Sequence, residues 1–107
     1  MSYNLIITPA FERNSKPLLK KYKSLKADLA GLFESLENEP IIGKSLGKDC
    51  YKIRLPITSK GKGKSGGARV ITCVKIISDK IFLLTIYDKS DKEDISDKEL
   101  NELLRNI

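Results

Sequence analysis

The chain has 107 residues, which is enough for one domain and too few for two. Hydrophobic residues make up 40% and charged residues 32%, a profile that is typical of a globular protein and excludes a disordered one. The formal net charge is +6, and eight Lys or Arg residues but only one acid, Asp49, lie between Lys44 and Arg69. Positive charge concentrated in one part of the chain favours a polyanionic partner.

The chain begins with a predicted strand and a helix. Residues 3–8 have the composition of a strand, and Thr8 and Pro9 are a typical N-cap and first helical residue. The helix expected over residues 10–22 contains Pro17, which must either kink it or restart it.

A second helix is expected after Ser24, a typical capping residue. Apolar residues follow it at helical spacing: Leu25, Leu29, Leu32, Phe33 and Leu36. A loop then runs from residue 40 to residue 48, as Pro40 and Gly43 indicate. The next stretch, residues 50–57, alternates apolar and polar residues, so it predicts a strand with Lys52 and Arg54 on its polar face.

The second half of the chain predicts two more strands and a last helix. Residues 59–67, SKGKGKSGG, form an expected exposed hairpin loop or arm. Residues 69–77 are rich in β-branched residues and predict a strand, and Asp79-Lys80 marks a tight turn. The run 81–87 is apolar on both faces, so we expect it in the middle of the sheet. A short helix from about Ser96 has an inner stripe formed by Leu100, Leu103 and Leu104.

This order predicts one α+β domain over residues 1–107: an N-terminal strand, a helical hairpin, a three-stranded antiparallel meander and a C-terminal helix. We expect an antiparallel sheet with the helical pair packed on one face, while the face carrying Lys52 and Arg54 stays open. No signal peptide or membrane span is apparent, which predicts a cytoplasmic protein that does not bind membranes. Cys50 and Cys73 are interpreted as buried thiols, and neither a metal nor another cofactor is expected.

The tripeptide GKS occurs at residues 43–45 and again at residues 63–65. A nucleotide-binding P-loop also needs a glycine five residues before the GK pair, where this chain has Asn38 and Thr58. We therefore reject that interpretation. The lysine–glycine arm remains a candidate for non-specific phosphate contacts through Lys60, Lys62 and Lys64, and a solvated loop tip is the alternative.

Histidine is absent, so acid–base chemistry would fall to Lys, Arg or Tyr. Lys52 and Arg54 lie about 7 Å apart on one strand face, and a like charge so close favours a lysine that accepts a proton. Arg69 is a candidate phosphate clamp. The alternative is that an open sheet face simply needs polar residues. The acids of DKSDKEDISDKE, residues 88–99, are explained by helix capping and surface solvation.

Two segments resemble a known toxin family. GKDCYKIRL, residues 47–55, resembles the central strand of RelE-type ribonuclease toxins, and the later SKGKGKSGGARVI and IFLLTIYDKSDKEDIS resemble the HigB-like branch of that superfamily. The order of elements matches over essentially the whole chain. The resemblance implies a toxin of a bacterial type II toxin–antitoxin system that inhibits translation by cleaving messenger RNA on the ribosome.

In the family reaction, a ribose 2′-OH attacks the adjacent phosphate and leaves a 2′,3′-cyclic phosphate. By position, the resemblance makes Lys52 the candidate base, with Arg54 beside it. It makes Arg69 the phosphate clamp and Lys89 a cation near the scissile phosphate. The family has an arginine where this chain has Ser90, and Lys92 is a candidate substitute for its charge.

The family also has a tyrosine in the region of Ser96, so the proton donor is not identified. Tyr87 is a candidate stacking platform or acid; the alternative, which we favour, is a core aromatic at the end of a strand. The implied partners are messenger RNA, the ribosome with its RNA, and a cognate antitoxin in a hetero-oligomer. Two alternatives stay open: a ParE-like toxin that poisons DNA gyrase without nuclease activity, and a catalytically impaired RNA-binding domain.

Overall fold

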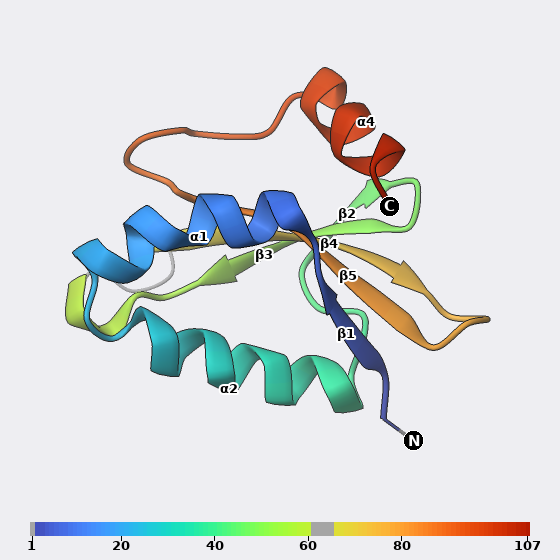
Figure 1. Cartoon of the computed structure of the whole chain (residues 1–107), viewed down its shortest axis with the longest axis horizontal. Helices are drawn as coiled ribbons and strands as arrows, with labels where there is room; N and C mark the ends of the chain where they lie inside the picture. The colour runs from blue at the N-terminus through green and yellow to red at the C-terminus, as the bar shows by residue number, and fades with distance from the viewer. Residues whose placement is uncertain (1, 61–65) are drawn as a thin grey trace.

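The structure, a computed structural model, describes residues 2–60 and 66–107 (Figure 1). Its elements in chain order are β1 (Asn4–Ile7), α1 (Pro9–Lys21), α2 (Leu25–Asn38), β2 (Lys44–Gly47), β3 (Cys50–Leu55), a short 3-10 helix (Thr58–Lys60), β4 (Ala68–Lys75), β5 (Lys80–Asp88) and α4 (Asp97–Arg105). The predicted α+β architecture is confirmed.

The strands form one five-stranded sheet in the order β1-β5-β4-β3-β2. Strands β2 to β5 pair antiparallel, as expected, but β1 pairs parallel with β5, so the sheet is mixed rather than antiparallel throughout. β5 is buried on both faces, and its backbone groups need partners on both sides because no water reaches them. β1 supplies the partners on one side and β4 on the other.

The N-terminal helices follow the sequence signals closely. The Thr8 hydroxyl accepts a hydrogen bond from the Phe11 N–H at 3.2 Å, so Thr8 is the N-cap of α1. α1 then runs from Pro9 to Lys21 as one helix with Pro17 inside it, so of the two predicted outcomes, a kink or a restart, the restart does not occur. Burial of Phe11 and Leu18 on either side of this proline offsets the hydrogen bond that it forfeits.

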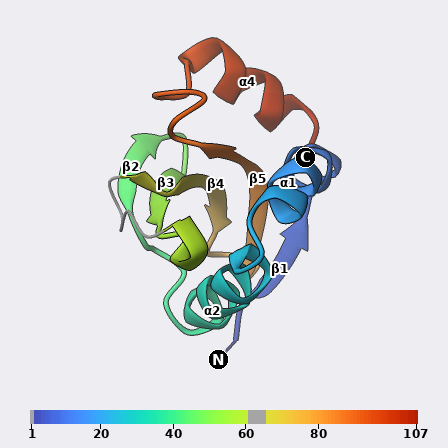
Figure 2. The same cartoon turned by 90° about the vertical axis from the view of Figure 1, so that its left-hand side faces the viewer.

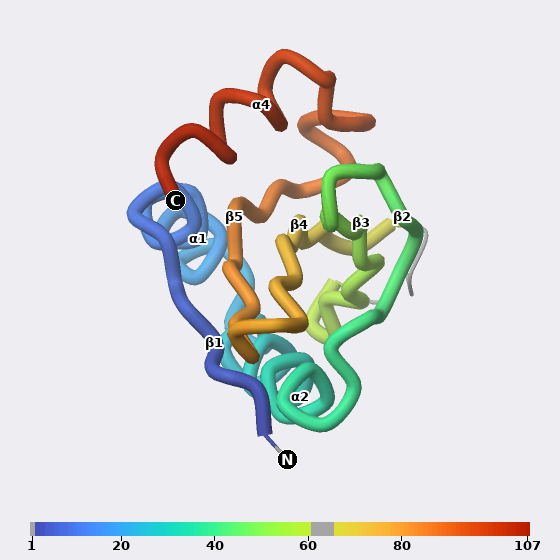
Figure 3. The backbone as a smooth tube through the Cα atoms, turned by 90° about the vertical axis from the view of Figure 1, so that its right-hand side faces the viewer, coloured from blue at the N-terminus to red at the C-terminus, as the bar shows by residue number. Residues whose placement is uncertain are grey.

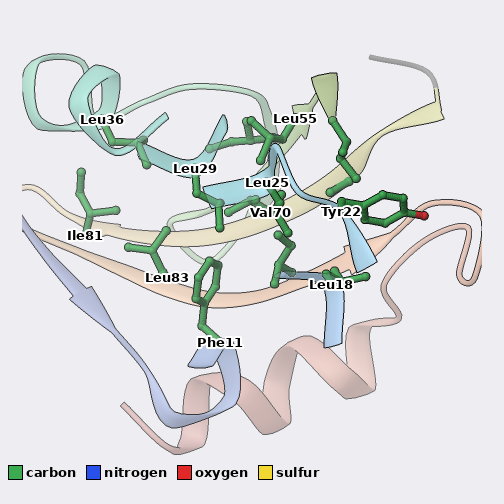
Figure 4. Packing of buried hydrophobic residues seen from close by; sticks show 14 of the residues in the cluster. Phe11, Leu18, Tyr22, Leu25, Leu29, Leu36, Leu55, Val70, Ile81 and Leu83 are labelled. Carbon is green, nitrogen blue, oxygen red and sulfur yellow. The ribbon is translucent and has the colours of Figure 1, made fainter. Parts of the chain in front are cut away.

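α1 and α2 cover one face of the sheet, as predicted, and enclose the larger hydrophobic core (Figure 4). Leu25 and Leu36 of α2 are fully buried, and Leu29 nearly so, which confirms the predicted stripe. The strand residues that they meet all lie on one face of the sheet: Ile53, Leu55, Val70, Ile81, Leu83 and Ile86.

The second face is only partly open, contrary to the expectation of a fully open face. α4 lies across it, on the side of the sheet away from α2 (Figures 2 and 3). Leu100 of α4 packs in a second core cluster with Cys50, Ile71, Cys73, Leu84 and Tyr87. The face that carries Lys52 and Arg54 also carries these apolar residues, and they need a cover because exposing them to water is unfavourable.

Strand β2 was not expected, since its segment was interpreted as part of a loop. It is short, mostly exposed and pairs only with β3. A tight turn joins the two strands, with Lys48 and Asp49 both at positive φ (55° and 64°). At the other end of β4 the structure also departs from the prediction: the strand ends at Lys75, and Ile76 and Ile77 lie exposed in the hairpin turn.

Candidate nucleic-acid interface

Three strands place charged and aromatic side chains in a row on the face of the sheet that α4 covers. Arg54 of β3 lies directly opposite Arg69 of β4, and Arg69 lies directly opposite Tyr87 of β5. Side chains directly opposite on antiparallel strands share a face, with Cβ atoms about 5 Å apart. Lys52 precedes Arg54 by two residues, so it lies on the same face. The structure therefore brings the predicted Lys52, Arg54 and Arg69 together.

Lys52 is half-buried and forms an ion pair. Its Nζ lies 3.1 Å from Oδ1 of Asp94, a residue of the segment that joins β5 to α4, and the side chain of Lys52 is 17% exposed. The backbone N–H of Ile95 and the Lys52 ammonium hold the pKa of Asp94 below its ordinary value. The acids of this segment were expected to be solvated or to cap a helix, and Asp94 is indeed 62% exposed, but it also pairs with the candidate base.

The two arginines of the row differ in burial. Arg54 is exposed, whereas Arg69 is only 3% exposed. One guanidinium nitrogen of Arg69 donates to the carbonyl oxygen of Ala68 at 3.2 Å. The planar guanidinium fork suits a phosphate, but at 3% exposure Arg69 can contact one only after the residues that cover it move aside. Arg54 is accessible to a ligand from solvent.

Tyr87 lies in the second core cluster and is 8% exposed, so its ring is a core aromatic, the alternative that we favour, and offers no surface for stacking. Burial, with a contribution from Asp94, raises the pKa of its hydroxyl to about 12. Within the described residues, the hydroxyl oxygen is buried without a hydrogen-bond partner. The Nζ of Lys92 lies 5.2 Å from the ring centroid.

The remaining predicted cations lie at different places around β5. Lys89 directly follows this strand and is half-buried, and its backbone N–H donates to the carbonyl oxygen of Gly67. Lys92 forms an ion pair with Glu99 of α4. Lys62 and Lys64 lie outside the described residues.

Lys60, the first lysine of the predicted arm, is half-buried and bound to a carboxylate. Its Nζ lies 2.8 Å from Oδ1 of the fully buried Asp88, and the Tyr22 hydroxyl donates to the other oxygen of this carboxylate at 2.5 Å. Ser90 also donates to Asp88, through its N–H and its hydroxyl. The Lys60 ammonium therefore stabilises a buried carboxylate, which argues against the predicted RNA contact of this side chain.

Sequence reasoning missed Lys44 as a site residue. Strand β2 places Lys44 directly opposite Lys52, so the two side chains share the face of the row. We call Lys44, Lys52, Arg54 and Arg69 the basic face. Lys44 was counted in the charge of this segment but assigned to a loop. Only the pairing of β2 with β3 shows that it lies beside the candidate base.

The two serines that stand at the positions of the family's arginine and tyrosine have structural roles. The Ser90 side chain binds Asp88, and Ser96 caps α4 by accepting a hydrogen bond from the Glu99 N–H at 3.1 Å. Neither hydroxyl is directed to the basic face by these bonds.

No group of three or more Cys, Asp or Glu side chains in residues 2–60 and 66–107 is arranged to hold a metal ion. The helices in the described part of the chain are all too short or too polar to cross a bilayer.

Solved structures of a bacterial toxin share this α+β fold. A double arginine-to-alanine mutant of the E. coli toxin RelE in the free state is 23% identical, with a TM-score of 0.65, over 100% of this chain and 99% of that chain. The isolated E. coli RelE toxin in its P21 crystal form is 22% identical, with a TM-score of 0.60, over 99% of this chain and 100% of that one. The intact E. coli RelBE toxin–antitoxin complex contains a chain that is 21% identical, with a TM-score of 0.63, over 81% of this chain and 96% of that one.

These similarities establish a RelE-like fold. The model of the family described as the RelE toxin of the RelE/RelB toxin–antitoxin system matches residues 11–106. The chain therefore belongs to the RelE toxin family, as the resemblance of residues 47–55 and of the two later segments indicated.

Proposed function

We propose that this protein is the toxin of a bacterial type II toxin–antitoxin system and that it inhibits translation by cleaving messenger RNA on the ribosome. The observation that carries the proposal is the placement of Lys52, Arg54 and Arg69 side by side on one sheet face of a RelE-family chain. Such an array provides what phosphodiester cleavage needs most, which is fixed positive charge around the reacting phosphate.

In the proposed reaction, the 2′-oxygen of a ribose attacks the adjacent phosphorus atom and the bond from phosphorus to the 5′-oxygen breaks. The products are a 2′,3′-cyclic phosphate and a 5′-OH end, and the leaving 5′-oxygen takes its proton from water. Arg54 and Arg69 stabilise the negative charge that grows on the phosphate oxygens, and Lys89 adds a further cation. Lys52 accepts the proton of the 2′-OH.

The ion pair of Lys52 sets a condition on this mechanism. An ammonium group bound to a carboxylate cannot accept a proton. The contact between Lys52 and Asp94 must therefore open, and Lys52 must lose its own proton, before the attack. RNA entering the basic face opens this contact, because its phosphates compete with Asp94 for the same cation. A phosphate also favours the ammonium form, so the proton of Lys52 must then pass to solvent before the attack.

We infer that a cognate antitoxin binds this protein in the cytoplasm and holds it inactive in a hetero-oligomer. The chain shares its fold with the toxin of the RelBE complex. An antitoxin segment laid over the basic face would exclude RNA. A small reading frame adjoining this gene, whose co-expression restores growth, is the expected source of that partner.

Inducing the wild-type chain is expected to arrest growth and to cut messenger RNA within translated codons, which mapping of new 5′ ends detects. Lys52→Ala removes the base and Arg69→Lys keeps the charge but loses the planar fork, so both variants should lose toxicity. Lys20, an exposed residue of α1, provides the control: Lys20→Ala should remain as toxic as the wild type.

Circular dichroism should show that these variants are folded. Full toxicity of a folded Lys52→Ala or Arg69→Lys variant would remove these residues from the site. Intact transcripts together with a DNA-damage response would instead support a gyrase poison.

A second candidate, an RNA-binding protein without nuclease activity, is favoured by one observation. Tyr87 is buried, Ser90 is bound to Asp88 and Ser96 caps α4, so none of the three offers an accessible proton donor in this conformation. Co-sedimentation with ribosomes and translation arrest without new 5′ ends would support this candidate over the nuclease.

A further inference from the structure

Lys44 and Lys52 form a pair of cations at the edge of the sheet. They are directly opposite each other in the β2–β3 pairing, and with Arg54 they line an open hollow of about 450 Å³. The approach of the two strands depends on Gly43. A Cβ atom on Gly43 would lie 2.3 Å from the carbonyl oxygen of Lys52, and the φ of this glycine is +97°. The glycine of the first GKS tripeptide thus lets its lysine stand beside Lys52.

The pair already holds an anionic group. Asp94 contacts the Lys52 ammonium at 3.1 Å, and the positive charge of Lys44 also lowers the pKa of this carboxyl, after the larger effects of the Ile95 N–H and of Lys52. The side chain of Asp94 is 62% exposed. Exposed ion pairs are weak because water screens them, so another anion can replace this carboxylate at little cost.

A carboxylate and a phosphodiester present the same kind of ligand to an ammonium group, namely oxygens that share a negative charge. We infer that Lys44 and Lys52 form a binding subsite for one backbone phosphate of the RNA, and that Asp94 occupies this subsite in the free protein. The inference rests on the proposed function for its choice of ligand. The Asp94 carboxylate is then an intramolecular competitor that RNA displaces when it binds.

The test measures binding without cleavage. The full-length protein is titrated with a short single-stranded RNA in which every 2′-OH is methylated, which removes the attacking group. Asp94→Asn is expected to tighten binding about two- to fivefold, because the competing charge is lost. The control Glu93→Gln, which removes one negative charge from an exposed neighbour in the chain, should change the affinity much less.

Two further variants locate the effect. Lys44→Gln should weaken binding and reduce the slope of log K against log salt by about 0.7, the value for one phosphate contact on a single strand. In a Lys44→Gln, Lys52→Gln background, Asp94→Asn should lose its advantage, because the cations with which it competes are gone. Lys20→Gln, on α1, should leave both the affinity and the slope nearly unchanged.

Equal gains from Asp94→Asn and Glu93→Gln would overturn the subsite, since they would indicate general repulsion instead. An undiminished Asp94→Asn effect in the double-lysine background would overturn it too. Displacement of the RNA by inorganic phosphate, at constant ionic strength, would show that the two lysines bind a free phosphate ion rather than the RNA backbone, and would overturn the RNA subsite. If the affinities behave as expected but no variant cleaves RNA in cells, the subsite stands and the proposed nuclease function fails.

Discussion

Asp88 has the sequence context of a surface residue but is buried in the structure. In the sequence it begins a run of charged residues, yet in the structure it is 1% exposed and surrounded by donors from three segments. Burial alone would raise the pKa of this carboxyl, but hydrogen bonds from Lys60, Ser90 and Tyr22 outweigh burial and hold the pKa below its ordinary value. The carboxylate thus fixes the end of β5 to the C-terminal end of α1 and to the 3-10 helix.

Because the folded protein holds Asp88 ionised, Asp88→Asn is expected to lower the free energy of unfolding by about 3 kcal/mol at pH 7. The pH dependence has a defined sign. The pKa is lower in the folded than in the unfolded state, so the stabilisation is complete above the unfolded value of about 4 and is lost as the pH falls further. Urea unfolding between pH 7 and pH 2 measures it.

The control for this experiment is Glu93→Gln, which removes an exposed acid nearby in the chain. The Glu93→Gln variant should have the wild-type free energy of unfolding at pH 7, and this free energy should fall with decreasing pH as it does in the wild type. An Asp88→Asn variant that declines in acid as steeply as the wild type would show that the carboxylate of Asp88 is not the group responsible.

At the scale of elements, α4 decides how accessible the basic face is. The helix is strongly amphipathic in its sequence, with Leu100 buried and Leu103 and Leu104 packed against the second core cluster. Cys50 and Cys73 lie directly opposite each other beneath it, both fully buried, and burial raises the pKa of the Cys50 thiol to about 12. The reactivity of these two thiols therefore indicates whether α4 is packed on the sheet.

Leu100→Ala is expected to destabilise the protein by about 2–3 kcal/mol, since it leaves a cavity between α4 and the sheet. It should also accelerate the reaction of Cys50 and Cys73 with a thiol reagent, because α4 then undocks locally. Leu36→Ala, in the core on the opposite face, is the matched control. If Leu100→Ala and Leu36→Ala lower the global stability equally and their cysteines are also labelled at equal rates, local opening of α4 is excluded.

At the scale of the whole molecule, the two charge blocks of the sequence lie together. The basic segment from Lys44 to Arg69 supplies the basic face, and the acid-rich tail returns over that same face. Asp94 binds Lys52 and Asp88 binds Lys60 across this boundary. The net charge of +6 therefore overstates the positive charge that the free protein presents to RNA.

If all four cations of the basic face contact phosphates, the affinity for single-stranded RNA should fall steeply with salt. At about 0.7 per contact, the slope of log K against log salt is expected near −3. Binding titrations between 50 and 200 mM salt measure it. A slope near zero would show that the basic face does not contact the RNA backbone.

The sequence by itself determined most of the elements and the character of their faces. Helical spacing located α2 and α4, the Thr8-Pro9 signal located α1, and Thr8 and Ser96 marked two helix starts correctly. Alternation along residues 50–57 placed Lys52 and Arg54 on one face. These features depend on neighbours one to four residues apart, so local periodicity contains the information needed to predict them.

Only the tertiary structure decided what lies across that face. β2 is four residues long, KSLG, and has no pattern of its own; it is a strand because β3 offers it an unpaired edge. The parallel pairing of β1 with β5, the cover provided by α4 and the contact of Asp94 with Lys52 all join segments distant in sequence. Such contacts arise from burying shared apolar surface and pairing buried or neighbouring charges, which no short stretch of sequence encodes.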